Sequence, residues 1–217
     1  MCGIVGKVDF VHSSALSECD IALMAELLRH RRPDGGGIYE SAVNPRQLNG
    51  AKVLLGHRRL KVIDLRREAA QPMHNTMCVR SGRGQPLVIV FNGEIYNYRD
   101  LRLKLRSEGH QLMSQSDTEV ILHLYEDHGV GCLKYLHGMF AFAIWDEQAQ
   151  MLFAARDRIG KKPFFYHFNG GQFVFASEAR AILLDPAVRV EPNLLAIHHY
   201  LTYGYVPGLL LGIPWCS

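Results

Sequence analysis

The sequence is poor in cysteine, and the few cysteines do not form a pattern typical of a disulfide framework or a zinc site. Its 217 residues contain Cys2, Cys19, Cys78, Cys132 and Cys216. The number is odd, the spacing is wide, and there is no Cys-x-x-Cys pair. Disulfide-stapled secreted proteins and cysteine-rich zinc modules are therefore not expected. We predict reduced thiols in a cytoplasmic protein, and no metal ligands.

The sequence also lacks a long apolar run and a strong net charge. No segment approaches the ~20 apolar residues that span a bilayer. The N-terminus does not read as a secretory signal, and Asp9 falls early in it. The net charge is +3, and basic residues are interspersed with acidic ones, so neither a nucleic-acid surface nor a membrane surface is indicated. With 48% hydrophobic residues, the chain has ample core for one large domain or two small ones.

Apolar runs and helical periodicity predict an α+β protein. Strands are expected over 2–10, 51–65 (two short strands), 87–91, 138–146, 151–157, 163–168 and 172–177. Helices are expected over 15–30, 98–108, 130–137, 177–184, 192–201 and from a capping-box pattern at 116–119. Residues 30–37 and 71–86 are interpreted as irregular, and Asn-Gly at 92–93 as a sharp turn. This order favours two stacked, mainly antiparallel sheets between helix layers.

The first chemical signal is a cysteine directly after the initiator methionine. Removal of Met1 would leave Cys2 with a thiol and a free α-amine on the same carbon. The thiol is a strong nucleophile, and the adjacent amine can take its proton because an α-amine titrates near ~8. The alternative is that Cys2 is a small apolar residue opening a buried strand.

Further residues match what a cysteine nucleophile would need. Asn92 and Gly93 could supply an amide and a backbone N–H to an oxyanion, or simply form a turn. Arg59 could bind a carboxylate, or be a surface arginine. Asp117, with Glu94 near it, could bind an ammonium, or cap a helix. Together the functional readings describe an amino acid whose side-chain carbonyl is attacked.

Ten segments in order carry a resemblance to a known family. They are MCGIVG, LRHRRPD, GHRRLKVIDL, QPM, FNGEIYNY, SDTEVIL, GMFAFAIWD, RDRIGKKPFFY, FASEARAIL and YLTYGYVPG. They resemble the N-terminal glutaminase half of glutamine-dependent asparagine synthetases, which are class II glutamine amidotransferases. The resemblance covers nearly the whole chain, with the domain expected over 2–208 and an atypical apolar tail over 209–217.

The resemblance implies a four-layer αββα N-terminal nucleophile (Ntn) hydrolase sandwich. It implies that glutamine is hydrolysed to glutamate and ammonia through a thioester. The implied catalytic residues are Cys2 as nucleophile and Asn92 with Gly93 as oxyanion hole. For substrate binding it implies Arg59 at the α-carboxylate, Glu94 and Asp117 at the α-amino group, and backbone from Leu60 to Ile63, Val62 included, along the pocket.

The chain departs from the family pattern in three places. Arg32 and Gln115 stand where glycine is common, and no SGG-type phosphate loop of a synthetase is found. ATP and Mg would therefore belong to a separate synthetase domain or partner protein that accepts the ammonia, and no cofactor is expected in this chain. A truncated, non-catalytic remnant and an autoprocessed peptidase are the alternatives. Whether the chain forms a homodimer stays open.

Overall fold

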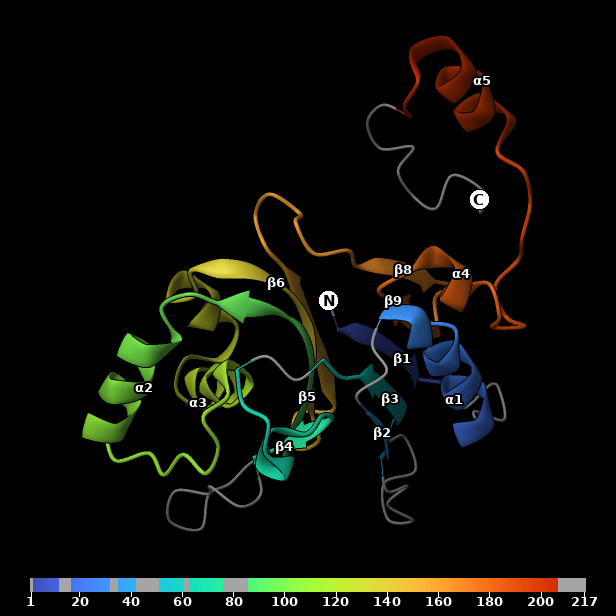
Figure 1. Ribbon diagram of the computed structural model, residues 1–217. Helices are drawn as coiled ribbons and strands as arrows, with labels where there is room; N and C mark the ends of the chain where they lie inside the picture. The colour runs from blue at the N-terminus through green and yellow to red at the C-terminus, as the bar shows by residue number, and fades with distance from the viewer. Residues whose placement is uncertain are drawn as a thin grey trace.

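Two antiparallel sheets form the body of the molecule (Figure 1). The computed structural model describes residues 2–11, 17–31, 35–41, 51–60, 63–75 and 86–206. The first sheet has the order β2 (Gly36–Glu40), β3 (Lys52–Arg58), β1 (Gly3–Asp9), β9 (Gln172–Ala176) and β8 (Phe165–Phe168). The second has the order β4 (Met73–His74), β5 (Leu87–Ile95), β6 (Gly138–Asp146) and β7 (Met151–Arg156).

Helices cover the outer faces of both sheets. The first sheet carries α1 (Glu18–Glu26) and α4 (Ala179–Ile182), and the second carries α2 (Tyr98–Ser107) and α3 (Asp117–His128). Short 3-10 helices occupy Arg29–Arg31, Arg67–Ala69 and Gly129–Lys134. The predicted sandwich of two mainly antiparallel sheets between helix layers is therefore confirmed.

Successive side chains of a strand point to opposite faces of its sheet, and both faces are packed against other layers. This explains why several strands appear in the sequence as continuous apolar runs. In β5, Val88 and Val90 pack between the sheets, whereas Ile89 packs against the layer of α2 and α3. In β1, Ile4 packs between the sheets and Val5 packs toward α1. Because residues 87–91 of β5 are buried on both faces, this part of the strand shows no polar alternation.

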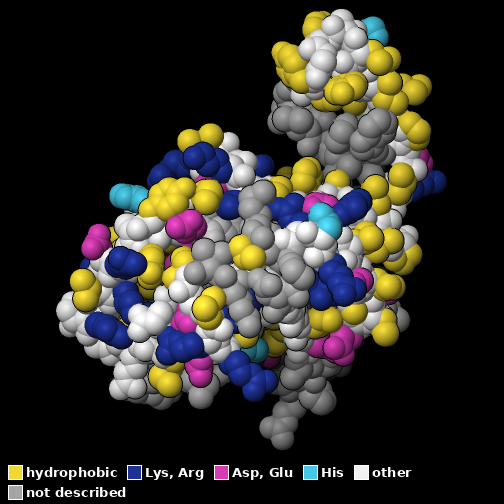
Figure 2. All heavy atoms as spheres, in the orientation of Figure 1, with side chains coloured by type: hydrophobic (Ala, Val, Ile, Leu, Met, Phe, Trp, Pro, Cys, Tyr) yellow, Lys and Arg dark blue, Asp and Glu magenta, His cyan; other side chains and the backbone are white. Residues whose placement is uncertain are grey.

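Helix α5 (Leu194–Tyr203) differs from the others because it projects away from the two sheets (Figure 1). Hydrophobic side chains gather over it (Figure 2), and Leu194 and Leu201 are among its exposed residues.

The expected tail at 209–217 lies outside the described residues. No described helix has the length and apolar character required to cross a bilayer.

Several local predictions were wrong. Asn92 and Gly93 lie inside β5, paired with Ala141 and Phe140 of β6, and do not form a turn. Residues 36–37, expected in a loop, begin β2, and the excursion expected over 71–86 contains β4. Only one strand, β3, forms among the described residues of 51–65, and the helix expected near 130–137 is the 3-10 helix at 129–134.

Candidate active site

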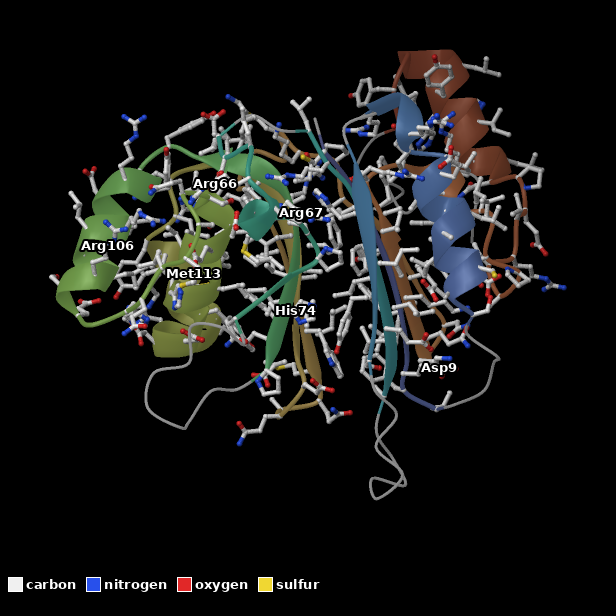
Figure 3. The ribbon with its side chains drawn as sticks, turned by 60° about the horizontal axis from the view of Figure 1, so that its bottom comes forward. Asp9, Arg66, Arg67, His74, Arg106 and Met113 are labelled. Carbon is white, nitrogen blue, oxygen red and sulfur yellow. The ribbon has the colours of Figure 1, made fainter. Side chains whose placement is uncertain are left out.

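A cavity of about 230 Å³ lies where the ends of several elements meet. Cys2 precedes β1, Leu60 follows β3, Glu94 lies near the end of β5, and Asp117 begins α3. In Figure 3 the label of Arg66 marks this end of the molecule. The label of Asp9, the last residue of β1, marks the opposite end. Every predicted site residue that the structure describes lines the cavity: Cys2, Arg59, Leu60, Ile63, Asn92, Gly93, Glu94 and Asp117. Val62 lies outside the described residues.

The Cys2 thiol is held by the backbone of Leu60. The Leu60 N–H donates to Cys2 Sγ at 3.3 Å, and Sγ lies 3.9 Å from the Leu60 carbonyl oxygen. Burial raises the pKa of the Cys2 thiol, and the Leu60 hydrogen bond partly opposes that rise. The charge of Asp117 raises this pKa further, whereas Lys162 lowers it. The sulfur is therefore a thiol near neutral pH, and its attack on a substrate requires a base.

Asn92 is fully buried, and its side-chain amide makes no hydrogen bond within the described part of the chain. Neither Nδ2 nor Oδ1 has a partner among the described residues, although the residue is 0% exposed. A buried polar group without a partner costs about 1–3 kcal/mol. Since the residue borders the cavity, a bound ligand can supply the missing partner.

Gly93 is required by the neighbouring strand. A Cβ at this position would lie 2.4 Å from the Met139 carbonyl oxygen and 2.8 Å from Phe140 Cα. Glycine here admits a close backbone approach, and the approaching backbone is that of β6. A side chain at position 93 would force β5 and β6 apart beside the cavity.

The Arg59 guanidinium is anchored to the loop that follows it. Its Nη1 donates to the Arg66 carbonyl at 3.0 Å and its Nη2 to the Asp64 carbonyl at 2.6 Å. The Asp64 carboxylate in turn accepts from the Gln115 N–H at 2.7 Å and from Arg66 Nη2 at 2.8 Å. Hydrogen bonds from Arg66 hold the pKa of Asp64 well below its usual range. The orientation of Arg59 is thus fixed by this loop.

Asp117 is a buried carboxylate at the N-terminus of α3. Its Oδ2 accepts from the Ile95 N–H at 3.0 Å, and the side chain is 3% exposed. Burial raises the pKa of Asp117 to about 6, and the charge of Glu94 raises it in the same direction. A cation bound beside Asp117 would favour its ionised form.

The capping-box prediction at this helix start was half right. Ser116 is the N-cap, because its Oγ accepts from the Thr118 N–H at 3.1 Å. Glu119, however, accepts from the backbone N–H groups of Met113 and Ser114 at 2.6 and 2.8 Å. The acid therefore stabilises the loop that leads into the helix.

Three further cavity residues, Asp64, Gln71 and Lys162, were missed as site residues in the sequence. Gln71 Oε1 accepts from the Phe91 N–H at 2.6 Å, and its Nε2 donates to Thr118 Oγ1 at 3.1 Å. Gln71 therefore links β5 to the start of α3. The QPM segment contributed to the resemblance, but nothing in the sequence marks these contacts.

Two sheets between helix layers, with a cysteine at the head of a central strand, define the Ntn class of fold. The profile of the family described as "Glutamine amidotransferase domain" matches residues 1–209. The chain belongs to this family: it is a class II glutamine amidotransferase domain related to asparagine synthetases.

Relatives and solved structures agree with this placement. The chain is 42% identical over 191 residues to asparagine synthetase [glutamine-hydrolyzing] 3 of Bacillus subtilis, covering 88% of this chain and 29% of that protein. It is 35% identical over 216 residues to putative asparagine synthetase [glutamine-hydrolyzing] 2 of Methanocaldococcus jannaschii, covering 95% and 40%.

A solved structure of B. subtilis glutamine phosphoribosylpyrophosphate amidotransferase is similar in fold. It matches with a TM-score of 0.65 and 24% identity, over 84% of this chain and 43% of that one. This likeness concerns the fold alone. The chain thus spans 29–40% of the length of the two synthetase relatives.

Proposed function

We propose that this chain hydrolyses L-glutamine to glutamate and ammonia, with Cys2 as the nucleophile after removal of Met1. One observation carries the proposal. The Cys2 sulfur and the hydrogen-bond-free amide of Asn92 border the same cavity. A nucleophile beside an unsatisfied, buried donor is the pairing that acyl transfer requires.

The proposed chemistry has two balanced halves. The α-amine of Cys2 takes the thiol proton as Sγ attacks the side-chain carbonyl carbon of glutamine. Asn92 Nδ2 and the Gly93 N–H stabilise the oxyanion. The C–N bond then breaks, the departing nitrogen receives the proton and leaves as ammonia, and a thioester remains. Water attacks the thioester, releasing glutamate and restoring the thiol.

The charged residues of the cavity fit the two ends of the same substrate. Arg59, fixed by the carbonyls of Asp64 and Arg66, would donate to the α-carboxylate. Asp117 and Glu94 would accept from the α-ammonium. The backbone of Leu60 and Ile63 would line the pocket between them. The hydrolysis uses groups of this chain alone.

The similarity to glutamine-hydrolysing asparagine synthetases suggests which reaction uses the ammonia. We propose that it serves an ATP- and Mg-dependent synthetase, present as a further domain or as a partner protein, in the cytoplasm. The chain spans 29–40% of the length of those relatives. The synthetase reaction would therefore take place in a domain or protein other than this glutaminase domain.

The test begins with the mass of the N-terminus of the purified chain and its release of glutamate from glutamine. We expect loss of Met1, turnover of glutamine, and labelling of Cys2 by an electrophilic glutamine analogue. Cys2→Ala should abolish turnover, whereas Cys19→Ala, at an exposed cysteine of α1, should not. A folded chain with Met1 removed and no glutamate release would instead identify a non-catalytic remnant.

A further inference from the structure

A second cluster of chemically reactive side chains lies away from the glutaminase cavity. It comprises His110, which follows α2, and His123 and Glu126, which lie on α3. The two histidine side chains are 2% and 1% exposed, and that of Glu126 is 18% exposed. None of the three lines the active-site cavity. The sequence prediction of no metal site rested on cysteine spacing and did not consider these histidines.

One nitrogen or oxygen atom from each residue converges on a common point. His110 Nδ1 and His123 Nδ1 are 3.1 Å apart. Glu126 Oε2 lies 2.8 Å from His123 Nδ1 and 3.8 Å from His110 Nδ1. Tetrahedral Zn²⁺, with bonds of about 2.0–2.2 Å to nitrogen and oxygen, separates its ligand atoms by about 3.3–3.5 Å. The three observed separations bracket that value.

The groups behind these atoms are those that orient metal ligands in proteins. Asp127 Oδ2 lies 2.8 Å from His110 Nε2, so it can accept the proton there and leave Nδ1 as a lone pair. Asn75 Nδ2 donates to Glu126 Oε1 at 2.6 Å, which fixes the carboxylate with Oε2 turned inward toward His123 Nδ1. His123 has no such outer group among the described residues, because its Nε2 is buried there without a hydrogen-bond partner.

We propose that His110, His123 and Glu126 bind a divalent first-row transition ion, with Zn²⁺ as the best match. Two imidazoles and one carboxylate form a donor set that Zn²⁺ accepts, with a fourth position left for water. The partial exposure of Glu126 provides the entry side. Bound there, the ion would tie α3 to the segment that follows α2 and stabilise this half of the sandwich.

The experiment uses the untagged chain in a Cys2→Ser, Cys19→Ser background, because thiolates also bind zinc. After treatment with a chelator, the protein is titrated with Zn²⁺ by calorimetry and with Co²⁺ by visible absorption. We expect one ion per chain, four-coordinate ligand-field bands for Co²⁺, and a higher melting temperature with the ion. Loss of an outer partner in Asp127→Asn should weaken Zn²⁺ binding about 10–100-fold. Glu126→Gln should weaken it further.

His128→Gln is the matched control, because His128 lies on the same helix but stacks on Tyr135. This variant should bind Zn²⁺ as the parent does. If the parent binds no stoichiometric ion, or if Glu126→Gln and His110→Asn bind as tightly as His128→Gln, the proposal is wrong. The cluster is then a set of hydrogen bonds between α3 and its neighbouring segment. These measurements do not depend on glutaminase activity, so the two proposals fail separately.

Discussion

At the scale of single residues, Asn92 is where stability and the proposed catalysis make opposite demands. Its amide is buried with no partner among the described residues, which is unfavourable in the free protein. In the proposed reaction, the same amide would already be desolvated and oriented when charge develops on the substrate carbonyl oxygen. The folded chain therefore carries a local destabilisation that a transition state would relieve.

Asn92→Leu, a change of similar volume, separates the two effects. We expect the free energy of unfolding to rise by up to about 1–3 kcal/mol, because an unpaired polar group is removed. We expect kcat for glutamine to fall about 10²–10³-fold, with little change in KM. Denaturant unfolding and steady-state kinetics measure the two.

Asn75→Leu is the control for this prediction. Asn75 is also buried, but its Oδ1 accepts from the Leu87 N–H at 2.8 Å. Its replacement should lower the free energy of unfolding. Equal destabilisation by the two variants would contradict the assignment of Asn92 as unsatisfied.

The raised pKa of Asp117 predicts a pH dependence of substrate binding. Below about pH 6 this carboxyl takes up a proton and no longer attracts the α-ammonium of glutamine. We expect kcat/KM to rise with pH through about 6. Asp117→Asn should flatten this limb and weaken binding about 10–100-fold, since a hydrogen bond to a charged group contributes about 1.5–3 kcal/mol. Asp100→Asn, at an exposed acid of α2, should leave the profile unchanged.

Stability should change with pH in the opposite sense at this residue. The folded-state pKa of Asp117 is raised to about 6, above an unfolded value near ~3.9. Its contribution is therefore fully present below the unfolded pKa and is lost as pH rises through about 6. The stability of Asp117→Asn relative to the parent should be greater at pH 8 than at pH 4, as measured by thermal unfolding. A constant difference would contradict the raised pKa.

At the scale of elements, the pairing of β5 with β6 decides the geometry beside the cavity. Gly93→Ala places a Cβ 2.4 Å from the Met139 carbonyl oxygen, so the strands must separate. We expect a loss of about 1–3 kcal/mol in the free energy of unfolding, as for other overpacked sites. Gly131→Ala, where the nearest atom lies 4.0 Å from the added Cβ, should change it little. Denaturant unfolding compares the two, and similar losses would contradict the steric argument.

The strands and helices with strong apolar patterns were predictable, and the errors share one cause. Asn-Gly at 92–93 carries a local turn signal, but its neighbour in β6 lies far along the chain and holds it extended. Gly36 and Gly37 read as helix and strand breakers, yet they pair with β3. Local chemistry predicts what a segment prefers alone, whereas pairing with a distant strand decides what it adopts.

The residues of the candidate site also fall into those that the sequence could predict and those that it could not. Cys2, Arg59 and Asp117 could be predicted as cavity residues because their side chains carry the chemistry that the proposed reaction needs and because their segments resemble a family. Asp64 and Gln71 were missed because they act on backbone groups of other elements, which leaves no mark on residue spacing. His110 and His123 were missed for a similar reason, because the fold alone brings them together.

At the scale of the whole molecule, a buried ion pair ties the central strand β1 to the segment after α4. Lys7 Nζ lies 2.7 Å from Asp185 Oδ2, and the two side chains are 5% and 2% exposed. Lys7→Met should lower the free energy of unfolding by about 3–5 kcal/mol, because it leaves a buried charge alone. Arg29→Met, which breaks an exposed pair with Glu26, should lower it by less than about 1 kcal/mol. Thermal and denaturant unfolding distinguish them, and equal effects would show that the Lys7 pair is not isolated from water.

The two residues at the centre of the proposed reaction belong to different sheets: Cys2 directly precedes β1 of the first sheet, and Asn92 lies in β5 of the second. The layer of side chains between the sheets, including Ile4, Val90 and Phe175, therefore sets the distance from sulfur to oxyanion donor. A methylene added or removed in that layer changes this distance as well as the packing. If the proposed hydrolysis is correct, substitutions that alter its rate are then to be sought among residues that never touch glutamine.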